Sequence, residues 1–254
     1  MWYFFQNSFV ATGLIGLSLY LWRLAYALGD WAVLALTPLA LLLYFGFWRL
    51  MLYPWKAKLL IALREESPLA HFMTGKIRAT LLSLAFTTIA VFVLAWKALS
   101  TSASEAGILL SLIFVSGIVF SISQSFLERH LHQPFACATA TSCSTWAVAL
   151  PFTVLVAFWT WSNAVYPGAM IDATFREALQ IGLDKLPDRG GWIAEVMAVP
   201  YAYESGKLWV VVQFKEYPFV AALFSLDTAL FSIILARASI VVTQFIQSNS
   251  RNVA

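Results

Sequence analysis

The sequence predicts an all-α polytopic membrane protein with about six transmembrane helices and a small α+β extracytoplasmic insertion between the fifth and the sixth. Two observations lead to this prediction. Hydrophobic residues make up 61% of the 254 residues and charged residues only 11%, whereas soluble domains average about 45–50% and about 25%. In addition, long apolar runs alternate with short charged clusters along the chain. So few charges could not cover the surface of a soluble fold of this size.

Each apolar run is long enough to cross a bilayer, because a helix of roughly 20 residues spans a hydrocarbon core of about 30 Å. Backbone groups in lipid must bond to one another, so we expect helices rather than open strands. The expected helices cover residues 8–28, 31–53, 78–98, 107–127, 137–162 and 219–245.

Local signals mark the ends and bends of these helices. Gly29 suits the C-terminus of the first helix and Asp30 suits the N-cap of the second, which predicts a tight helical hairpin. Pro151 predicts a kink in the fifth helix. Residues 1–22, which include most of the first run, contain no Lys or Arg. We therefore expect a retained helix there and not a cleaved signal peptide.

Basic residues gather between the second and third runs. This segment carries two acidic residues, Glu65 and Glu66, against six basic ones: Arg49, Lys56, Lys58, Arg64, Lys76 and Arg78. The positive-inside rule places it in the cytoplasm. Six crossings then put residues 163–218, where seven acidic residues oppose five basic ones, on the outer side. The sequence thus predicts an integral protein of the bacterial inner (plasma) membrane with cytoplasmic N and C termini.

The chain divides into three regions on this prediction. Residues 1–162 form the first five helices with a cytoplasmic loop at 54–77, residues 163–218 form the extracytoplasmic cap, and residues 219–254 form the sixth helix and a cytoplasmic tail. Residues 55–66 of the loop have a partly amphipathic pattern. They predict either an interfacial helix on anionic lipid or a short connecting helix packed under the bundle.

The cap is expected to combine one helix with a β-hairpin. Residues 172–186 have a plausible N-cap and a short amphipathic pattern that ends at a proline, which predicts a helix. Residues 196–203 and 208–214 flank the turn-like segment 204–207 and predict two strands. A core of roughly 55 residues is too small to be stable alone, so the cap should pack on the spans or on a neighbouring subunit.

The sixth helix contains two charged residues, although burying a charge in lipid costs at least about 2.5–3.5 kcal/mol. Asp227 needs a partner or water, while Arg237, ten residues later, can extend toward the cytoplasmic headgroups. Asp227 is either a proton or cation site, or a packing residue bonded within or between subunits. Hydroxyl side chains share another face of this helix: Ser225, Thr228, Ser232, Ser239 and Thr243. Such a face lines a water path or, more commonly, packs helices together.

The fifth run begins with ten small residues, from Ala136 to Thr145. Small residues let helix backbones approach closely, and their hydroxyls bond across helix interfaces. We expect a tight helix–helix contact here, with a hydrated path as the alternative. The hydroxyl and thiol side chains of this segment are Cys137, Thr139, Thr141, Ser142, Cys143, Ser144 and Thr145.

The turn before the fifth run carries His130 and His132. On the predicted topology these two histidines, His71 and both cysteines all lie near the cytoplasmic boundary of the membrane. A metal or haem site is the sharper interpretation of this cluster. However, His-x-His does not bring both rings to one helical face, and the spacing of the cysteines sets their thiols apart. We therefore expect no cofactor, free thiols, and a boundary cluster that contacts lipid phosphate or a partner.

The sequence lacks a Gly-rich phosphate loop, a Gly-x-Ser-x-Gly motif and a His-Glu-x-x-His motif. We therefore expect a non-enzymatic membrane subunit of a larger homo- or hetero-oligomeric complex that docks through small-residue helix seams and the cap. Its partners would be the lipid bilayer and other membrane subunits, with no nucleic acid. One alternative is an ion or small-solute channel or transporter lined by Asp227 and the Ser/Thr faces of the fifth and sixth helices. The second is a metal- or haem-binding redox protein.

Overall fold

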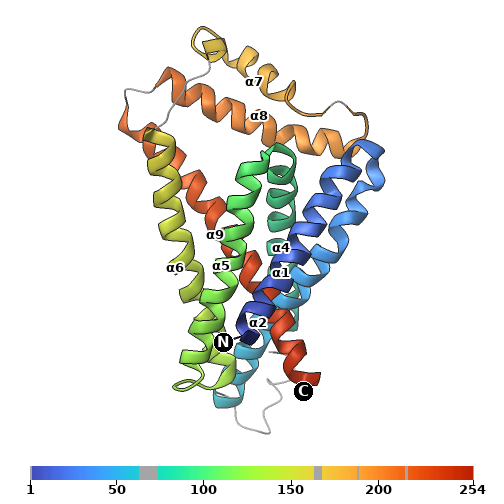
Figure 1. The fold of residues 1–254 in the computed structure, drawn as a ribbon, viewed down its shortest axis with the longest axis vertical. Helices are drawn as coiled ribbons and strands as arrows, with labels where there is room; N and C mark the ends of the chain where they lie inside the picture. The colour runs from blue at the N-terminus through green and yellow to red at the C-terminus, as the bar shows by residue number, and fades with distance from the viewer. Residues whose placement is uncertain (1, 63–73, 163–167, 188, 215–216, 254) are drawn as a thin grey trace.

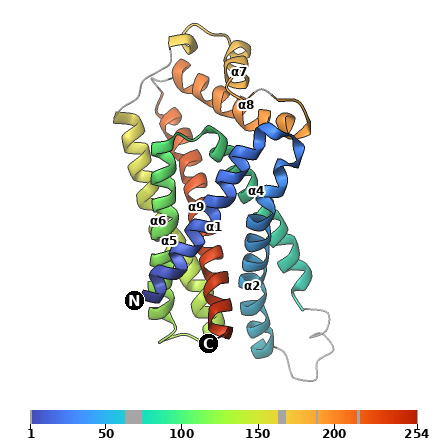
Figure 2. The same ribbon diagram turned by 45° about the vertical axis from the view of Figure 1, so that its right-hand side comes forward.

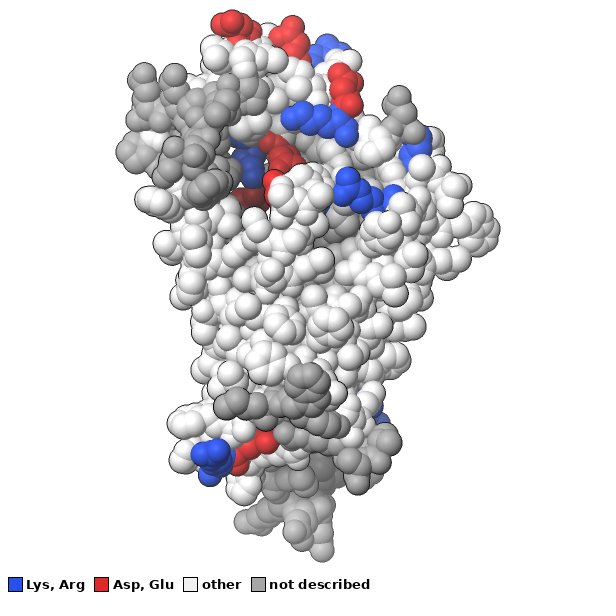
Figure 3. All heavy atoms as spheres, in the orientation of Figure 1, with Lys and Arg blue, Asp and Glu red and all other residues white. Residues whose placement is uncertain are grey.

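A computed structural model shows a bundle of long helices with a helical cap across one end (Figure 1). It describes residues 2–62, 74–162, 168–187, 189–214 and 217–253. Six helices in these ranges are long and apolar enough to cross a membrane, which agrees with the predicted number of spans. On the face shown in Figure 3, charged side chains gather at the two ends of the molecule and leave a wide uncharged belt between them.

The spanning helices are α1 (Trp2–Ala25), α2 (Thr37–Ala62), α4 (Lys76–Ser100), α5 (Ala103–Leu127), α6 (Gln133–Ser162) and α9 (Pro218–Val253). Helix α9 occupies the centre of the bundle, because it packs against α1, α2, α4, α5 and α6. Half of the most apolar part of α9 is buried, compared with 28–39% in the other spans. Its polar residues therefore meet neighbouring helices more than lipid.

A compact turn joins α1 to α2. It contains two short 3₁₀ segments, η1 (Tyr26–Leu28) and η2 (Asp30–Leu36). Gly29 between them has a φ of +127°, which glycine adopts without steric cost, and this confirms the predicted glycine turn. The prediction for Asp30 is wrong: Gly29 takes the N-cap position and no side chain caps η2. The Asp30 carboxylate binds the cap instead.

Helix α2 continues beyond the predicted start of the cytoplasmic loop. It passes through Pro54 and ends at Ala62. The ring of Trp55 lies against the backbone of Gly75, and the guanidinium of Arg78 lies 5.0 Å from the centre of that ring. The last turns of α2 thus pack against the start of α4, and residues 55–62 continue the spanning helix rather than forming a separate short helix. Most of the remaining loop, residues 63–73, lies outside the described residues.

Glycines allow the closest approaches inside the bundle. A Cβ atom at Gly46 of α2 would lie 2.6 Å from Cγ1 of Val241 on α9. A Cβ atom at Gly117 of α5 would lie 2.7 Å from Ser8 Oγ on α1 and 2.8 Å from Thr243 Oγ1 on α9. Such separations are below van der Waals contact, so α1, α5 and α9 meet at Gly117 because it has no side chain.

The described residues of the cap form helices joined by turns and irregular segments, and they contain no strand. The helices are η3 (Gly168–Met170), α7 (Phe175–Leu183) and α8 (Trp192–Gln213). The helix expected at residues 172–186 is confirmed as α7. Its N-cap is Thr174, whose hydroxyl accepts the Glu177 N–H while the Glu177 carboxylate accepts the Thr174 N–H.

The predicted β-hairpin is wrong, because the single helix α8 runs through both expected strands and the expected turn. Ile193, Met197 and Tyr201 recur at intervals of four residues and are buried against the cap-side ends of α1, η2 and α4. This burial favours a helix over alternating strands. Figures 1 and 2 show α8 lying across the ends of the spans, with α7 on its outer side and both chain termini at the opposite end of the bundle.

Candidate functional site

Three ion pairs join described residues, and all three connect the cap to the spanning part of the chain. They are Arg189–Asp30, Lys97–Glu204 and Lys207–Asp227. The first lies at the turn between α1 and α2, and the other two lie under α8. Figure 3 shows charged side chains in a hollow between the cap and the uncharged belt. This junction is the main concentration of paired charges in the described structure.

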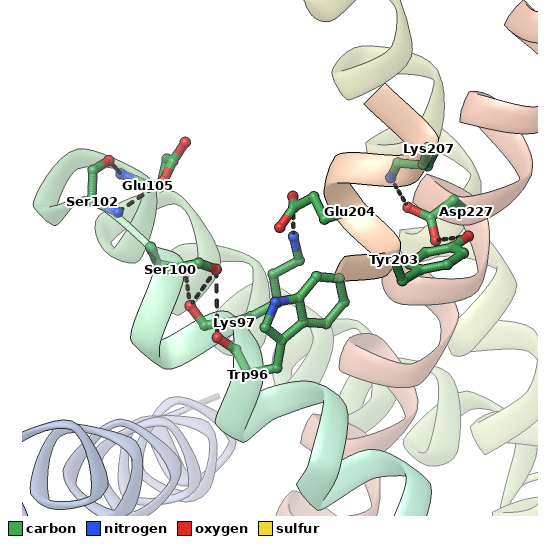
Figure 4. Close-up of polar contacts among 10 residues, drawn as sticks. Trp96, Lys97, Ser100, Ser102, Glu105, Tyr203, Glu204, Lys207 and Asp227 are labelled. Carbon is green, nitrogen blue, oxygen red and sulfur yellow. Dashed lines mark hydrogen bonds and ion pairs between the residues drawn. The ribbon is translucent and has the colours of Figure 1, made fainter. Parts of the chain in front are cut away.

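Asp227 is held by two side chains of α8. Lys207 Nζ donates to Asp227 Oδ2 at 2.5 Å, and the hydroxyl of Tyr203 donates to Oδ1 at 3.3 Å (Figure 4). The structure therefore places Asp227 at the junction with the cap, within a hydrogen-bonded ion pair. The sequence did not reveal these partners, because the predicted hairpin put residues 203 and 207 on a strand and in a turn. On a helix, their separation of four residues brings them to one face.

Lys97, near the end of α4, forms the neighbouring pair. Its Nζ lies 3.4 Å from Glu204 Oε1 and 4.3 Å from the centre of the Trp96 ring (Figure 4). Glu204 and Lys207 are three residues apart, so both ion pairs involve the same part of α8. Together they fix α8 to α4 and to α9.

The environment of α8 raises the pKa of two of its tyrosines, Tyr201 and Tyr203. Burial raises the pKa of Tyr203, and the negative charge of Asp227 and the hydrogen bond to it raise it further. Burial also raises the pKa of Tyr201, with smaller contributions from Tyr26 and Glu204. The Tyr203 hydroxyl therefore remains protonated near neutral pH and acts as a donor to Asp227 rather than as a base.

Arg237 lies far from Asp227, near the middle of the apolar span 226–250 of α9. Its guanidinium is 5.5 Å from the centre of the Phe47 ring on α2, and that ring stacks on Phe86 of α4 at 4.4 Å. Within the described residues it forms no hydrogen bond or ion pair. Because α9 continues to Val253, Arg237 is deeper in the helix than the predicted end at residue 245 implied.

The hydroxyl face of α9 is closed by packing. Ser232, Ser239 and Thr243 are fully buried. Ser239 donates across the interface to the carbonyl oxygen of Ile113 on α5 at 2.6 Å, while Ser232 and Thr243 donate to carbonyls of their own helix. These contacts favour helix packing over a water path. Thr228 is half-buried, and the side chain of Ser225 lies outside the described part.

The small residues of α6 divide between two faces. Thr141, Ser144 and Thr145 are buried toward the bundle, where α6 packs against α5 and α9. Thr141 and Thr145 donate to carbonyls four residues earlier in the helix. Cys137 is half-buried. The outward face carries Thr139, Ser142 and Cys143, all exposed.

His130 and His132 lie apart from the cap, in the exposed turn between α5 and α6. The ring of His130 is 5.4 Å from that of Phe126, and His132 is also exposed. No group of three His, Cys, Asp or Glu side chains that could hold a metal ion occurs within the described residues. His71 is outside them. Cys137 and Cys143 form no disulfide within the described residues.

A cavity of about 170 Å³, which the sequence did not reveal, opens between α1, α4, α5 and α9. Leucine and other apolar side chains form most of its wall, and Arg23 and Lys97 lie at its cap-side edge. The one available signal was that both cations lie within the last five or six residues of an apolar run.

Comparison of the chain with protein-family models, curated proteins and solved structures gave no match.

Proposed function

We propose that the chain is a non-enzymatic integral membrane subunit of a larger assembly, and that it docks through the outward face of α6 and through the cap. The observation that carries this proposal is the exposure of Thr139 and Ser142 on the outer side of α6. Their side chains face outward from an apolar helix and form no hydrogen bond within the described residues. Thr139 and Ser142 do not form the bond to an own-helix carbonyl that Thr141 and Thr145 form, so a neighbouring helix can supply their partners, and small side chains allow that helix to approach closely.

The cap offers a second surface of the same kind. Trp192, Val196 and Val199 of α8 are exposed and follow one another at intervals of four and three residues. This spacing puts them on one helical face. An apolar face on a helix outside the spanning segments fits contact with another subunit.

The closed packing of α9 supports a subunit over a channel. Ser239 is bonded to α5, and Asp227 is neutralised by Lys207. A conducting path through these residues would require both contacts to open.

Crosslinking through Cys143 tests the proposal directly. In a Cys137→Ala background, a maleimide–benzophenone reagent attached to Cys143 in native membranes should, on illumination, join this residue to one defined neighbouring chain. A matched control replaces Cys143 with alanine and introduces Leu84→Cys, which is exposed on a different helix, α4. That thiol should give no defined product.

The mass of the particle in mild detergent provides an independent measurement. We expect a protein mass well above the 28.3 kDa of one chain. A single chain in the particle, together with equal crosslinking from positions 143 and 84, would contradict the proposal.

A further inference from the structure

The cavity beneath the cap results from the divergence of two consecutive helices. Helix α4 ends at Ser100 and α5 begins at Ala103, yet these two helices are not among the pairs in extended contact. Figure 2 shows them leaving their common turn in different directions. Residues of α1 and α9 line the space between α4 and α5, and these four helices together enclose the cavity.

The wall of this cavity suits hydrocarbon. Leu94, Leu109, Ile113 and Leu235 contribute to it, one or two from each of three helices. An apolar cavity of about 150 Å³ stays free of water and binds small hydrocarbons. The volume of about 170 Å³ therefore fits a short length of acyl chain.

The cap-side edge of the cavity suits an anion. Lys97 is paired with Glu204, but Arg23 has no carboxylate partner within the described residues. Its guanidinium donates to the carbonyl oxygen of Thr101 at 2.7 Å, which accounts for one of its five N–H donors. The edge of the cavity thus carries one uncompensated positive charge with donors to spare.

We propose that this cavity holds one acyl chain of an anionic phospholipid from the leaflet on the cap side, with the lipid phosphate bound by Arg23. The order of the groups along the bundle matches the order within such a lipid. Arg23 lies at the level where α1 ends, and the apolar wall lies deeper between the helices. Electrostatic attraction to a basic residue near the surface selects anionic over zwitterionic lipid.

Native mass spectrometry of the intact chain tests this site. The protein is released from micelles that contain equal amounts of phosphatidylglycerol and phosphatidylcholine. We expect one phosphatidylglycerol to remain bound in preference to phosphatidylcholine, and Arg23→Gln to reduce its retention about fivefold. Arg176→Gln removes the same charge from an exposed position on α7 and should leave retention unchanged.

A second variant tests the cavity separately from the charge. Ala106→Leu extends a larger side chain from α5 into the cavity while Arg23 remains in place. It should displace the lipid, and circular dichroism checks that the helices persist. The proposal is overturned if both lipids bind equally to the wild-type chain, or if Arg23→Gln and Ala106→Leu both retain phosphatidylglycerol. Retention of a free fatty acid instead of the phospholipid would also overturn it.

Discussion

Arg189 and Asp30 are separated by 159 positions in the sequence and form an ion pair that fixes the start of α8 to the turn between α1 and α2. The guanidinium of Arg189 also donates to the carbonyl oxygen of Tyr26 at 2.6 Å and lies 4.7 Å from the centre of the Tyr26 ring. Gly191, with a φ of +107°, brings the backbone so close that a Cβ atom would lie 2.6 Å from Asp30 Oδ1. One arginine therefore joins the cap to the bundle through three contacts.

Replacing Arg189 with glutamine should loosen the cap. The Arg189 side chain is 5% exposed and that of Asp30 is 36% exposed, so solvent screens the pair in part. We expect the free energy of unfolding to fall by about 1–3 kcal/mol. Thermal unfolding in detergent, combined with proteolysis near residues 187–191, measures this change. Arg176→Gln serves as the control, and an equal stability of both variants would show that the pair contributes nothing.

Gly117 should tolerate no side chain. In Gly117→Ala the new Cβ atom would overlap the hydroxyls of Ser8 and Thr243, so α1 and α9 must move away from α5. We expect a loss of about 1–3 kcal/mol, as for other overpacked cores.

Gly107→Ala on the same helix provides the matched control for Gly117→Ala, because nothing lies within 4 Å of its Cβ position. Alanine is the better helix former, so this variant should unfold at the same temperature or higher. If Gly117→Ala were as stable as Gly107→Ala, the conclusion that α1, α5 and α9 approach closely at Gly117 would be contradicted.

The spans could be predicted from the sequence because lipid leaves a polypeptide few choices. Backbone groups without water must pair within the segment, so length and composition alone indicate a helix. The cap lies outside this constraint, and there the prediction depended on local signals. Ser205 and Gly206 indicated a turn, but they lie inside α8, where Ser205 contacts Gly182 and Gly206 contacts Phe175 of α7.

The small residues of α8 thus mark a close helix crossing rather than a turn. Local sequence cannot distinguish these two uses of glycine, because the partner helix is known only from the tertiary fold. The same reason hid the contacts of Asp227 and Asp30, since their partners lie far away in the sequence or on an element of the wrong predicted type.

Stability should depend on the ionisation of Tyr203 at high pH. Burial and the charge of Asp227 raise the pKa of this tyrosine in the folded chain above its unfolded value of about 10. Because the pKa is raised on folding, the contribution of Tyr203 to the free energy of unfolding is complete below pH 10. It is lost as the pH rises through the folded-state pKa.

Unfolding by denaturant at pH 8 and at pH 11, compared between the wild type and Tyr203→Phe, measures this effect. The wild type should lose more stability than Tyr203→Phe over this interval, because the variant lacks the ionising hydroxyl. Identical losses would show that the Tyr203 hydroxyl does not interact with Asp227.

Replacing Asp227 with asparagine should weaken the junction between α8 and α9 without creating or abolishing a current. The Lys207 side chain is 10% exposed, so loss of its anionic partner leaves a poorly solvated charge and costs about 1–3 kcal/mol. The double variant Lys207→Gln/Asp227→Asn should be less destabilised than the sum of the single variants, because the two residues interact directly. Thermal unfolding of the three variants measures this coupling, and planar bilayer recording of the wild type and Asp227→Asn measures conductance. A wild-type current that changes in Asp227→Asn would place this carboxylate on an ion path and would refute the assignment of the chain as a non-conducting subunit.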